Sequence, residues 1–153
     1  MSAAHRTLAH PLDRARPGKP GKNILLTDSG TGMVHSAMEG TLELADTLVV
    51  VGATTVDGAS RTGKTLDWLS AHGPTSDTST TRLAVLCQDR SSPEVDAQRV
   101  HDHFARRCRA VHAIPADPRL AAGGRIDLEA LREPTRHTFL EIAATIADDF
   151  AAR

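Results

Sequence analysis

Two short stretches of the sequence contain residue types that bind phosphate groups. The first, GASRTGKT at Gly58–Thr65, matches the G-x-x-x-x-G-K-[ST] pattern of a P-loop. In a P-loop the backbone N–H groups surround the phosphates, the lysine contacts them and the hydroxyl residue binds Mg²⁺. The second, TDSGTG, begins at Thr27 and follows a short apolar run. Its Asp28 can hold Mg²⁺ directly or through water, and Gly30 and Gly32 let backbone N–H groups approach phosphate oxygens.

Each stretch also has an ordinary structural interpretation. Aspartate and glycine at the end of a strand are common in turns and helix caps. A true P-loop joins a strand directly to a helix N-terminus, whereas Gly52–Asp57 separate the apolar run Val49–Val51 from the GASRTGKT stretch. In this second interpretation Asp57 caps the following helix, and Arg61 and Lys64 are solvated.

Alternating apolar and amphipathic segments must position these residues. Short apolar runs, typical of buried strands, occupy residues 24–28, 47–51, 83–87 and 110–114. Helical spacing of apolar residues follows each run, near residues 34–45, 59–71, 92–108 and up to residue 150. Ser92 and Pro93 suit the cap and first position of the third helix. The order βαβαβαβα predicts an α/β fold with a parallel sheet and flanking helices.

Composition favours one intracellular domain. A chain of 153 residues suits a single core, and no apolar run approaches the roughly 18 residues of a membrane span. The N-terminus lacks the apolar region of a secretory signal, so a cytoplasmic protein is expected. Cys87 and Cys108 stand apart without the spacing of a metal site, which favours two reduced thiols.

The first 22 residues differ from the rest in charge and composition. Five basic residues stand there against one aspartate, together with three prolines and two glycines, whereas the whole chain has a formal charge of −1. This composition predicts a disordered tail at residues 1–22 and a folded domain at residues 23–153. A basic tail this short is typically solvated, so direct binding of nucleic acid is not expected.

The stretch ILLTDSGTGMVHSAMEGTLELADTLVVVGATTVDGASRTGKTLDWL resembles the switch II half of ParA/MinD-type ATPases, a P-loop group with a deviant Walker motif. The stretch VDAQRVHDHFARRCRAVHAIPADPRLAAGGRIDLEALREPTRHTFLEIAATIADDF is similar to the C-terminal part of the MinD-like ATPases associated with type VII secretion. The resemblance covers residues 23–150. It implies the C-terminal part of a P-loop NTPase (Rossmann-like) fold, with ATP and Mg²⁺ as cofactors.

The resemblance also implies site residues. Asp28 matches the catalytic switch II acid that reaches Mg²⁺ through water, and Ser29, Gly30 and Gly32 match the loop that senses the γ-phosphate. The segment after the fourth strand matches a Pro-x-Asp stretch beside the adenine, at Pro115 and Asp117. Where the family often has an Asn that reads the base, this chain has Cys87-Gln88-Asp89, and Gln88 carries the same amide on a longer arm.

In the resembled family the P-loop precedes the switch II aspartate, whereas only the basic tail precedes Asp28 here. The resemblance therefore implies a truncated ATPase with weak or no hydrolysis by itself, and leaves enzymatic activity open. The family works as an ATP-dependent dimeric switch in secretion or partitioning, so a homodimer and a protein partner from such a system are expected. An uncovered sheet edge also predicts self-association. The alternatives are an interaction module of the same fold without nucleotide binding, and a P-loop protein that uses Gly58–Thr65.

Overall fold

A computed structural model describes residues 24, 26–28, 42, 45–72, 82–89 and 95–151, and the chain divides into two compact units, Met1–Val34 and His35–Arg153. In the first unit, residues 24 and 26–28 have no regular secondary structure, and the Leu26 side chain is 84% exposed. The predicted buried strand at residues 24–28 is therefore wrong for these four residues. A short apolar run becomes a strand only where a neighbouring strand supplies hydrogen bonds, and the pattern does not reveal that neighbour.

The second unit contains a three-stranded parallel sheet. Its strands are β1 (Leu48–Ala53), β2 (Arg82–Cys87) and β3 (Ala110–Ile114), and they lie in that order. Val51 of β1 pairs with Val85 of β2, which pairs with His112 of β3. The predicted α/β class with a parallel sheet is confirmed by this arrangement.

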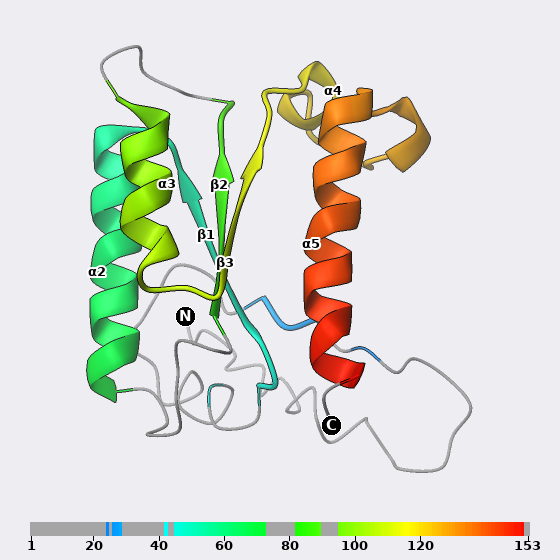
Figure 1. The fold of residues 1–153 in the computed structure, drawn as a ribbon. Coiled ribbons are helices and arrows are strands. Elements are labelled where there is room, and N and C mark those ends of the chain that lie inside the picture. The colour runs from blue at the N-terminus through cyan, green and yellow to red at the C-terminus, as the bar shows by residue number, and fades with distance from the viewer. Residues whose placement is uncertain are drawn as a thin grey trace, which may run out of the picture. The chain divides into compact units, whose positions relative to one another are not determined.

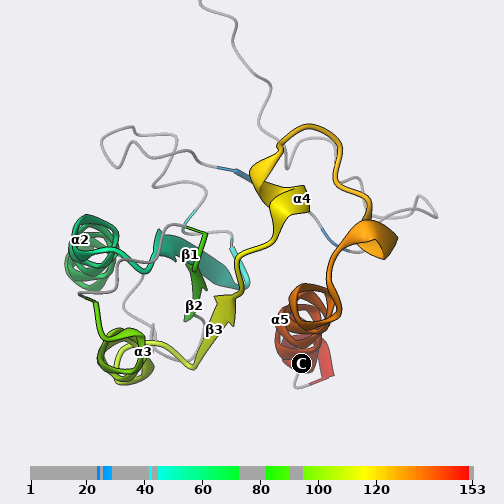
Figure 2. The same cartoon turned by 90° about the horizontal axis from the view of Figure 1, so that it is seen from above.

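Helices cover both faces of the sheet (Figures 1 and 2). On one face lie α2 (Val56–His72) and α3 (Ala97–Ala105), and on the other lies α5 (Glu133–Ala151). A short helix, α4 (Pro118–Ala121), and a 3₁₀ turn, η2 (Leu128–Ala130), connect β3 to α5. The predicted alternation of strands and helices is confirmed from β1 onward, while α4 and η2 had no counterpart in the prediction.

The main apolar core fills the space between the sheet and the helices α2 and α3. Leu66 of α2 and Phe104 of α3 are completely buried there. The other buried members of this core are Leu42, Val50, Leu69, Ala84, Leu86 and Cys108. Because β2 is the central strand, its side chains are buried on both faces, as is usual for parallel strands covered by helices.

The second face has a smaller apolar layer and several polar contacts. Its buried apolar residues are strand residues on the side away from the main core, together with one residue that precedes α5. They are Leu83, Val85, Ile114 and Leu131. His112 of β3 and Thr145 of α5 share a hydrogen bond of 3.0 Å between the imidazole Nε2 and the hydroxyl. The Arg109 guanidinium donates to the Thr145 carbonyl at 3.1 Å. Polar groups thus add to the apolar contacts between α5 and β3.

The connection from β1 to α2 requires two glycines. A Cβ atom on Gly52 would lie 2.0 Å from the Thr62 hydroxyl oxygen, and one on Gly58 would lie 2.5 Å from the Ala53 carbonyl oxygen. The Thr55 hydroxyl accepts a hydrogen bond from the Gly58 N–H at 3.0 Å and so caps α2. The prediction that Asp57 caps this helix is wrong, because the helix begins one residue earlier, at Val56, and Asp57 lies in its first turn.

The start of α3 also differs from its prediction. Asp96 is the N-cap, and its carboxylate accepts hydrogen bonds from the N–H groups of Gln98 and Arg99. Residues 95 and 96 are not helical, so a helix that begins at Pro93 and continues through them is wrong. Ser92 and Pro93 themselves lie outside the described residues. Aspartate is as good a helix cap as serine, and in this helix Asp96 rather than Ser92 sets the start.

Candidate functional site

The carboxyl ends of the three strands lie at one edge of the sheet, where open α/β folds bind ligands. Hydrogen bonds join the residues that follow each strand. The Thr54 N–H and hydroxyl both donate to the Cys87 carbonyl, at 3.1 and 3.2 Å. The Gln88 N–H donates to the Ile114 carbonyl at 3.0 Å. These contacts hold the three strand ends in a fixed arrangement beyond the sheet itself.

A hollow of about 260 Å³ lies at this edge, beside the ends of β2 and β3. Its walls combine small apolar groups with two aspartates and one arginine. The lining residues are Asp89, Ala116, Asp117, Pro118, Ala121 and Arg132. Ligand pockets usually measure about 300–1,000 Å³, so this hollow has room for one part of a ligand, such as a single base.

Asp117 is buried in this region, with 2% of its surface exposed, and both its carboxylate oxygens accept backbone hydrogen bonds. One oxygen accepts from the Arg119 N–H and the other from the Arg132 N–H, each at 2.9 Å. These two N–H groups hold the pKa of Asp117 below its usual value. Asp117 therefore caps α4, where Pro118 takes the favoured first position, and ties α4 to the residue before α5.

The other residues predicted at the base-binding end are brought together by the structure. Pro115 follows the end of β3 and is half-buried, and Gln88 follows the end of β2 and is half-buried as well. Of the two residues after Cys87, Asp89 lines the hollow. Burial raises the pKa of the Cys87 thiol, and the Asp89 carboxylate raises it further. Asp89 was not among the predicted site residues, although its position after a buried strand is a usable signal.

The predicted phosphate and magnesium residues fall in the first unit. Asp28 is described, and its side chain is exposed. Ser29, Gly30 and Gly32 lie outside the described residues. The roles of these four positions in binding Mg²⁺ and the γ-phosphate stay predictions.

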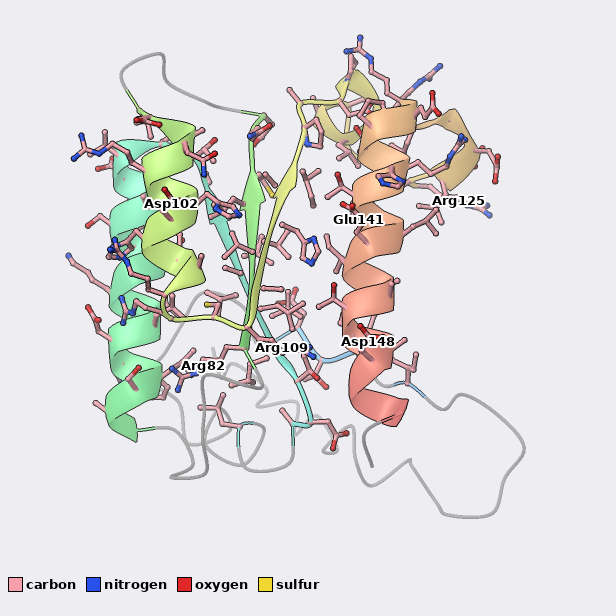
Figure 3. All side chains as sticks on the ribbon, in the orientation of Figure 1. Arg82, Asp102, Arg109, Arg125, Glu141 and Asp148 are labelled. Atoms are coloured by element: carbon pink, nitrogen blue, oxygen red, sulfur yellow. The ribbon has the colours of Figure 1, made fainter. Side chains whose placement is uncertain are left out.

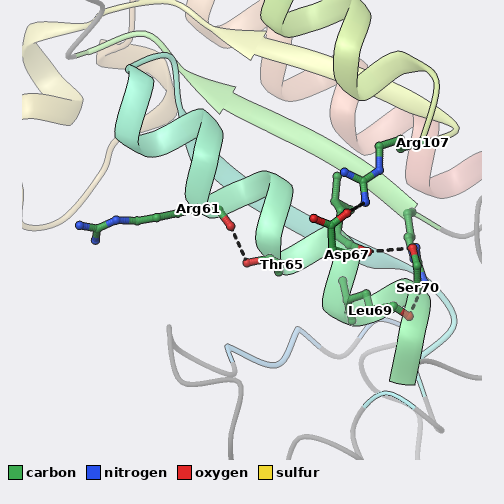
Figure 4. A network of polar contacts seen from close by, with 8 residues as sticks. Arg61, Thr65, Asp67, Leu69, Ser70 and Arg107 are labelled. Atoms are coloured by element: carbon green, nitrogen blue, oxygen red, sulfur yellow. Dashed lines mark hydrogen bonds and ion pairs between the residues drawn. The ribbon is translucent and has the colours of Figure 1, made fainter.

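The GASRTGKT stretch is helical along its whole length, as part of α2 (Figure 4). The Gly58 N–H donates to the Thr55 hydroxyl and the Ala59 N–H donates to the Thr55 carbonyl, so neither faces a phosphate. The Thr65 hydroxyl donates to the Arg61 carbonyl at 3.1 Å, and the Lys64 side chain is exposed. The stretch therefore lacks the loop conformation of a P-loop, and the interpretation as a solvated helical segment is confirmed.

Arginines surround the segment that carries α4 and η2. Arg119, Arg125 and Arg132 are exposed, and Arg125 projects from the turn between α4 and η2 (Figure 3). Arg136 lies 3.8 Å from the Glu129 carboxylate. The turn itself uses Gly123 and Gly124, whose φ angles of 68° and 81° favour glycine. Arg132 is the member of this group that lines the hollow.

Two further properties concern the described part of the chain. It contains no group of three or more His, Cys, Asp or Glu side chains placed to hold a metal ion. None of its helices is long and apolar enough to cross a membrane.

Comparison with known proteins finds a similarity to a secretion-associated protein. The chain is 30% identical over 138 residues to the ESX-1 secretion-associated protein EspI of Mycobacterium tuberculosis (strain CDC 1551 / Oshkosh), and equally so to EspI of strain ATCC 25618 / H37Rv. The aligned region is 89% of this chain but 21% of the relative, so the chain spans about a fifth of the length of these curated relatives. No protein-family model matches the chain, and no solved structure matches it.

Proposed function

We propose that this chain is a nucleotide-binding module of the ParA/MinD type that works with a type VII secretion system. The similarity to an ESX-1 secretion-associated protein over 89% of the chain carries the secretion part of the proposal. The nucleotide part rests on the resemblance to ParA/MinD-type ATPases. It is supported by a parallel sheet whose carboxyl edge is hollowed beside β2 and β3.

The proposed roles are taken for each unit by itself. In the first unit Asp28 is proposed as a magnesium ligand through water, and Ser29, Gly30 and Gly32 are proposed as phosphate contacts. In the second unit Gln88 and Pro115 lie at the base. Asp117 acts there as a positioning residue, because its oxygens already accept the N–H groups of Arg119 and Arg132.

Hydrolysis of ATP by this chain alone is expected to be weak or absent. Phosphoryl transfer depends on cations and backbone donors placed around the β- and γ-phosphates. In the described residues the one stretch with a P-loop pattern is helical, and its lysine is exposed on α2. We therefore propose that nucleotide binding changes the association of the module with a protein partner of the secretion system.

Titration of the full chain with a fluorescent ATP analogue, with and without Mg²⁺, tests the proposal. Saturable binding that strengthens with Mg²⁺ is expected. Asp28→Asn is expected to remove the effect of Mg²⁺, since an amide is a poorer magnesium ligand than a carboxylate. Lys64→Ala is the matched control and leaves the affinity unchanged. Absence of saturable binding at millimolar nucleotide contradicts the proposal, and a loss of affinity in Lys64→Ala contradicts the assignment of GASRTGKT as a solvated helix.

One observation favours the second candidate, an interaction module that binds no nucleotide. The carboxylate of Asp117 is fully used in capping α4, and the hollow is smaller than usual ligand pockets. Such a module keeps its thermal stability unchanged when ATP and Mg²⁺ are added, whereas a ligand that binds the folded state raises the melting temperature. Melting curves with and without nucleotide therefore separate the two candidates.

A further inference from the structure

The hollow of about 260 Å³ beside the ends of β2 and β3 has an arginine in its lining. Arg132 shares this lining with two aspartates and with small apolar residues, which are Ala116, Pro118 and Ala121. Ligand pockets usually measure about 300–1,000 Å³, so the hollow admits one flat ring system rather than a whole nucleotide. The group that enters it therefore has to be small and has to suit charges of both signs.

The main chain of Arg132 is held in place on both sides. Its N–H donates to the buried Asp117 carboxylate at 2.9 Å. Its carbonyl accepts from the Arg136 N–H at 3.0 Å, in the first turn of α5. The side chain itself is exposed. The guanidinium thus reaches the hollow from a fixed point, while the long side chain keeps the freedom to settle on a ligand.

The charges of the lining favour a neutral group over a phosphate. Asp117 accepts hydrogen bonds from the neutral N–H groups of Arg119 and Arg132, so its negative charge remains in the wall of the hollow. Phosphate oxygens beside this carboxylate would meet a like charge, which weakens binding. A nucleotide base is uncharged and flat, and the planar guanidinium of arginine stacks on such rings. The lining therefore suits the base of a nucleotide better than its phosphates.

We propose that Arg132 binds the base of the nucleotide by stacking its guanidinium on the ring, while the small apolar residues of the hollow contact the remaining ring surface. This inference rests on the nucleotide binding proposed above and adds a residue that recognises the ligand. Stacking depends on the planar shape of the guanidinium as well as on its charge, so a lysine does not replace it. It acts on the base alone, so it contributes equally to the binding of ATP and of adenosine.

Competition binding with the full chain tests this inference. ATP or adenosine displaces a fluorescent ATP analogue from the wild type and from Arg132→Ala, Arg132→Lys and Arg125→Ala, in the presence of Mg²⁺. Arg132→Ala is expected to weaken ATP and adenosine by the same factor, about three- to tenfold, which is usual for a cation stacked on a ring. Arg132→Lys is expected to lie closer to Arg132→Ala than to the wild type. Arg125→Ala is the matched control and keeps the wild-type affinities, since Arg125 is an exposed arginine on the turn after α4 and does not line the hollow (Figure 3).

Several results overturn the inference and leave the proposed nucleotide binding intact. They are unchanged affinities in Arg132→Ala, a loss for ATP without a loss for adenosine, full recovery in Arg132→Lys, an equal loss in Arg125→Ala, and failure of adenosine to compete in the wild type. Absence of saturable binding of the analogue to the wild type contradicts the proposed function itself, and this inference with it. The Arg132 hydrogen bonds described above use only its main chain, so far-UV circular dichroism of the variants is expected to match the wild type.

Discussion

The two faces of the sheet are built from different kinds of contact. On the α2 and α3 face, side chains such as Leu66 and Phe104 are completely buried in one apolar cluster. On the α5 face the buried apolar layer is smaller, and Thr145 of the helix adds polar contacts with both His112 and Arg109. Asp117 adds a further polar tie at the start of this face.

The two faces are therefore expected to have different roles, one in the stability of the fold and the other in binding. Apolar burial contributes about 25 cal/mol per Å² and does not depend on pH, so the α2 and α3 face is expected to supply most of the folding free energy. The α5 face carries the polar contacts of Thr145 and the exposed side chains of Val49 and Val51, and the hollow beside Asp89 and Arg132 lies at the carboxyl edge of the sheet. Contacts with ligands or partners are therefore expected on the second face and at its edges.

The largest effect is expected from a substitution in the apolar core on the α2 and α3 face. Phe104→Ala is expected to lower the free energy of unfolding by about 3–5 kcal/mol, because a completely buried aromatic ring leaves a cavity. Phe139→Ala on α5 is the comparison, since Phe139 is half-buried, and it is expected to cost about 1–2 kcal/mol. Urea unfolding followed by circular dichroism measures both. Equal losses for the two variants contradict the proposed division between the faces.

The next effect concerns how closely α2 approaches β1. Gly52→Ala is expected to destabilise the fold by about 1–3 kcal/mol, because the new methyl group meets the buried Thr62 hydroxyl. Adding Thr62→Ala removes that hydroxyl and is expected to restore part of the loss. Gly63→Ala is the control on the same helix, where the added Cβ meets nothing within 4 Å, and it is expected to stabilise by roughly 0.5–1 kcal/mol. Thermal melts of the four proteins test the series, and a destabilised Gly63→Ala contradicts it.

The sequence predicts the elements of the second unit well because their signals are local. Apolar runs locate β1, β2 and β3, and Pro115 follows the last residue of β3 directly. Helix starts are less well predicted, since Thr55 and Asp57, or Ser92 and Asp96, are chemically similar caps. Only the three-dimensional packing decides between them, as the close contact at Gly52 does for α2.

The candidate site is predicted only in part. The positions of Gln88, Pro115 and Asp117 at one edge follow from the parallel order of the strands. The sequence does not predict that both Asp117 oxygens accept hydrogen bonds, because one donor, the Arg132 N–H, is 15 residues away in the sequence. The GASRTGKT pattern shows the opposite case, in which a matching motif adopts a helix because Thr55 caps it two residues after the strand ends.

The smallest effect is expected from a substitution of Asp117. Its effect on stability depends on pH, whereas the apolar burial on the α2 and α3 face does not. Backbone N–H groups lower the pKa of the folded-state carboxylate, so its stabilising contribution is present above the unfolded pKa of about 3.9 and is lost as the pH falls through the lower folded pKa. Asp117→Ala is expected to lower the melting temperature by about 3 °C at neutral pH. This difference from the wild type is expected to shrink below about pH 4, where the unfolded state binds a proton that the folded carboxylate does not, and to disappear below the lower folded pKa.

Asp127 provides the matched control for Asp117. Its carboxylate caps the short turn η2 with a single hydrogen bond of 3.1 Å from the Glu129 N–H, and it is exposed. Asp127→Ala is therefore expected to change the melting temperature by less than Asp117→Ala at every pH. Melting temperatures of both variants and the wild type between about pH 3 and pH 7 give the comparison. If the loss in Asp117→Ala is the same at both ends of this range, the carboxylate does not act through its charge, and α5 is held by packing in the same way as α2 and α3.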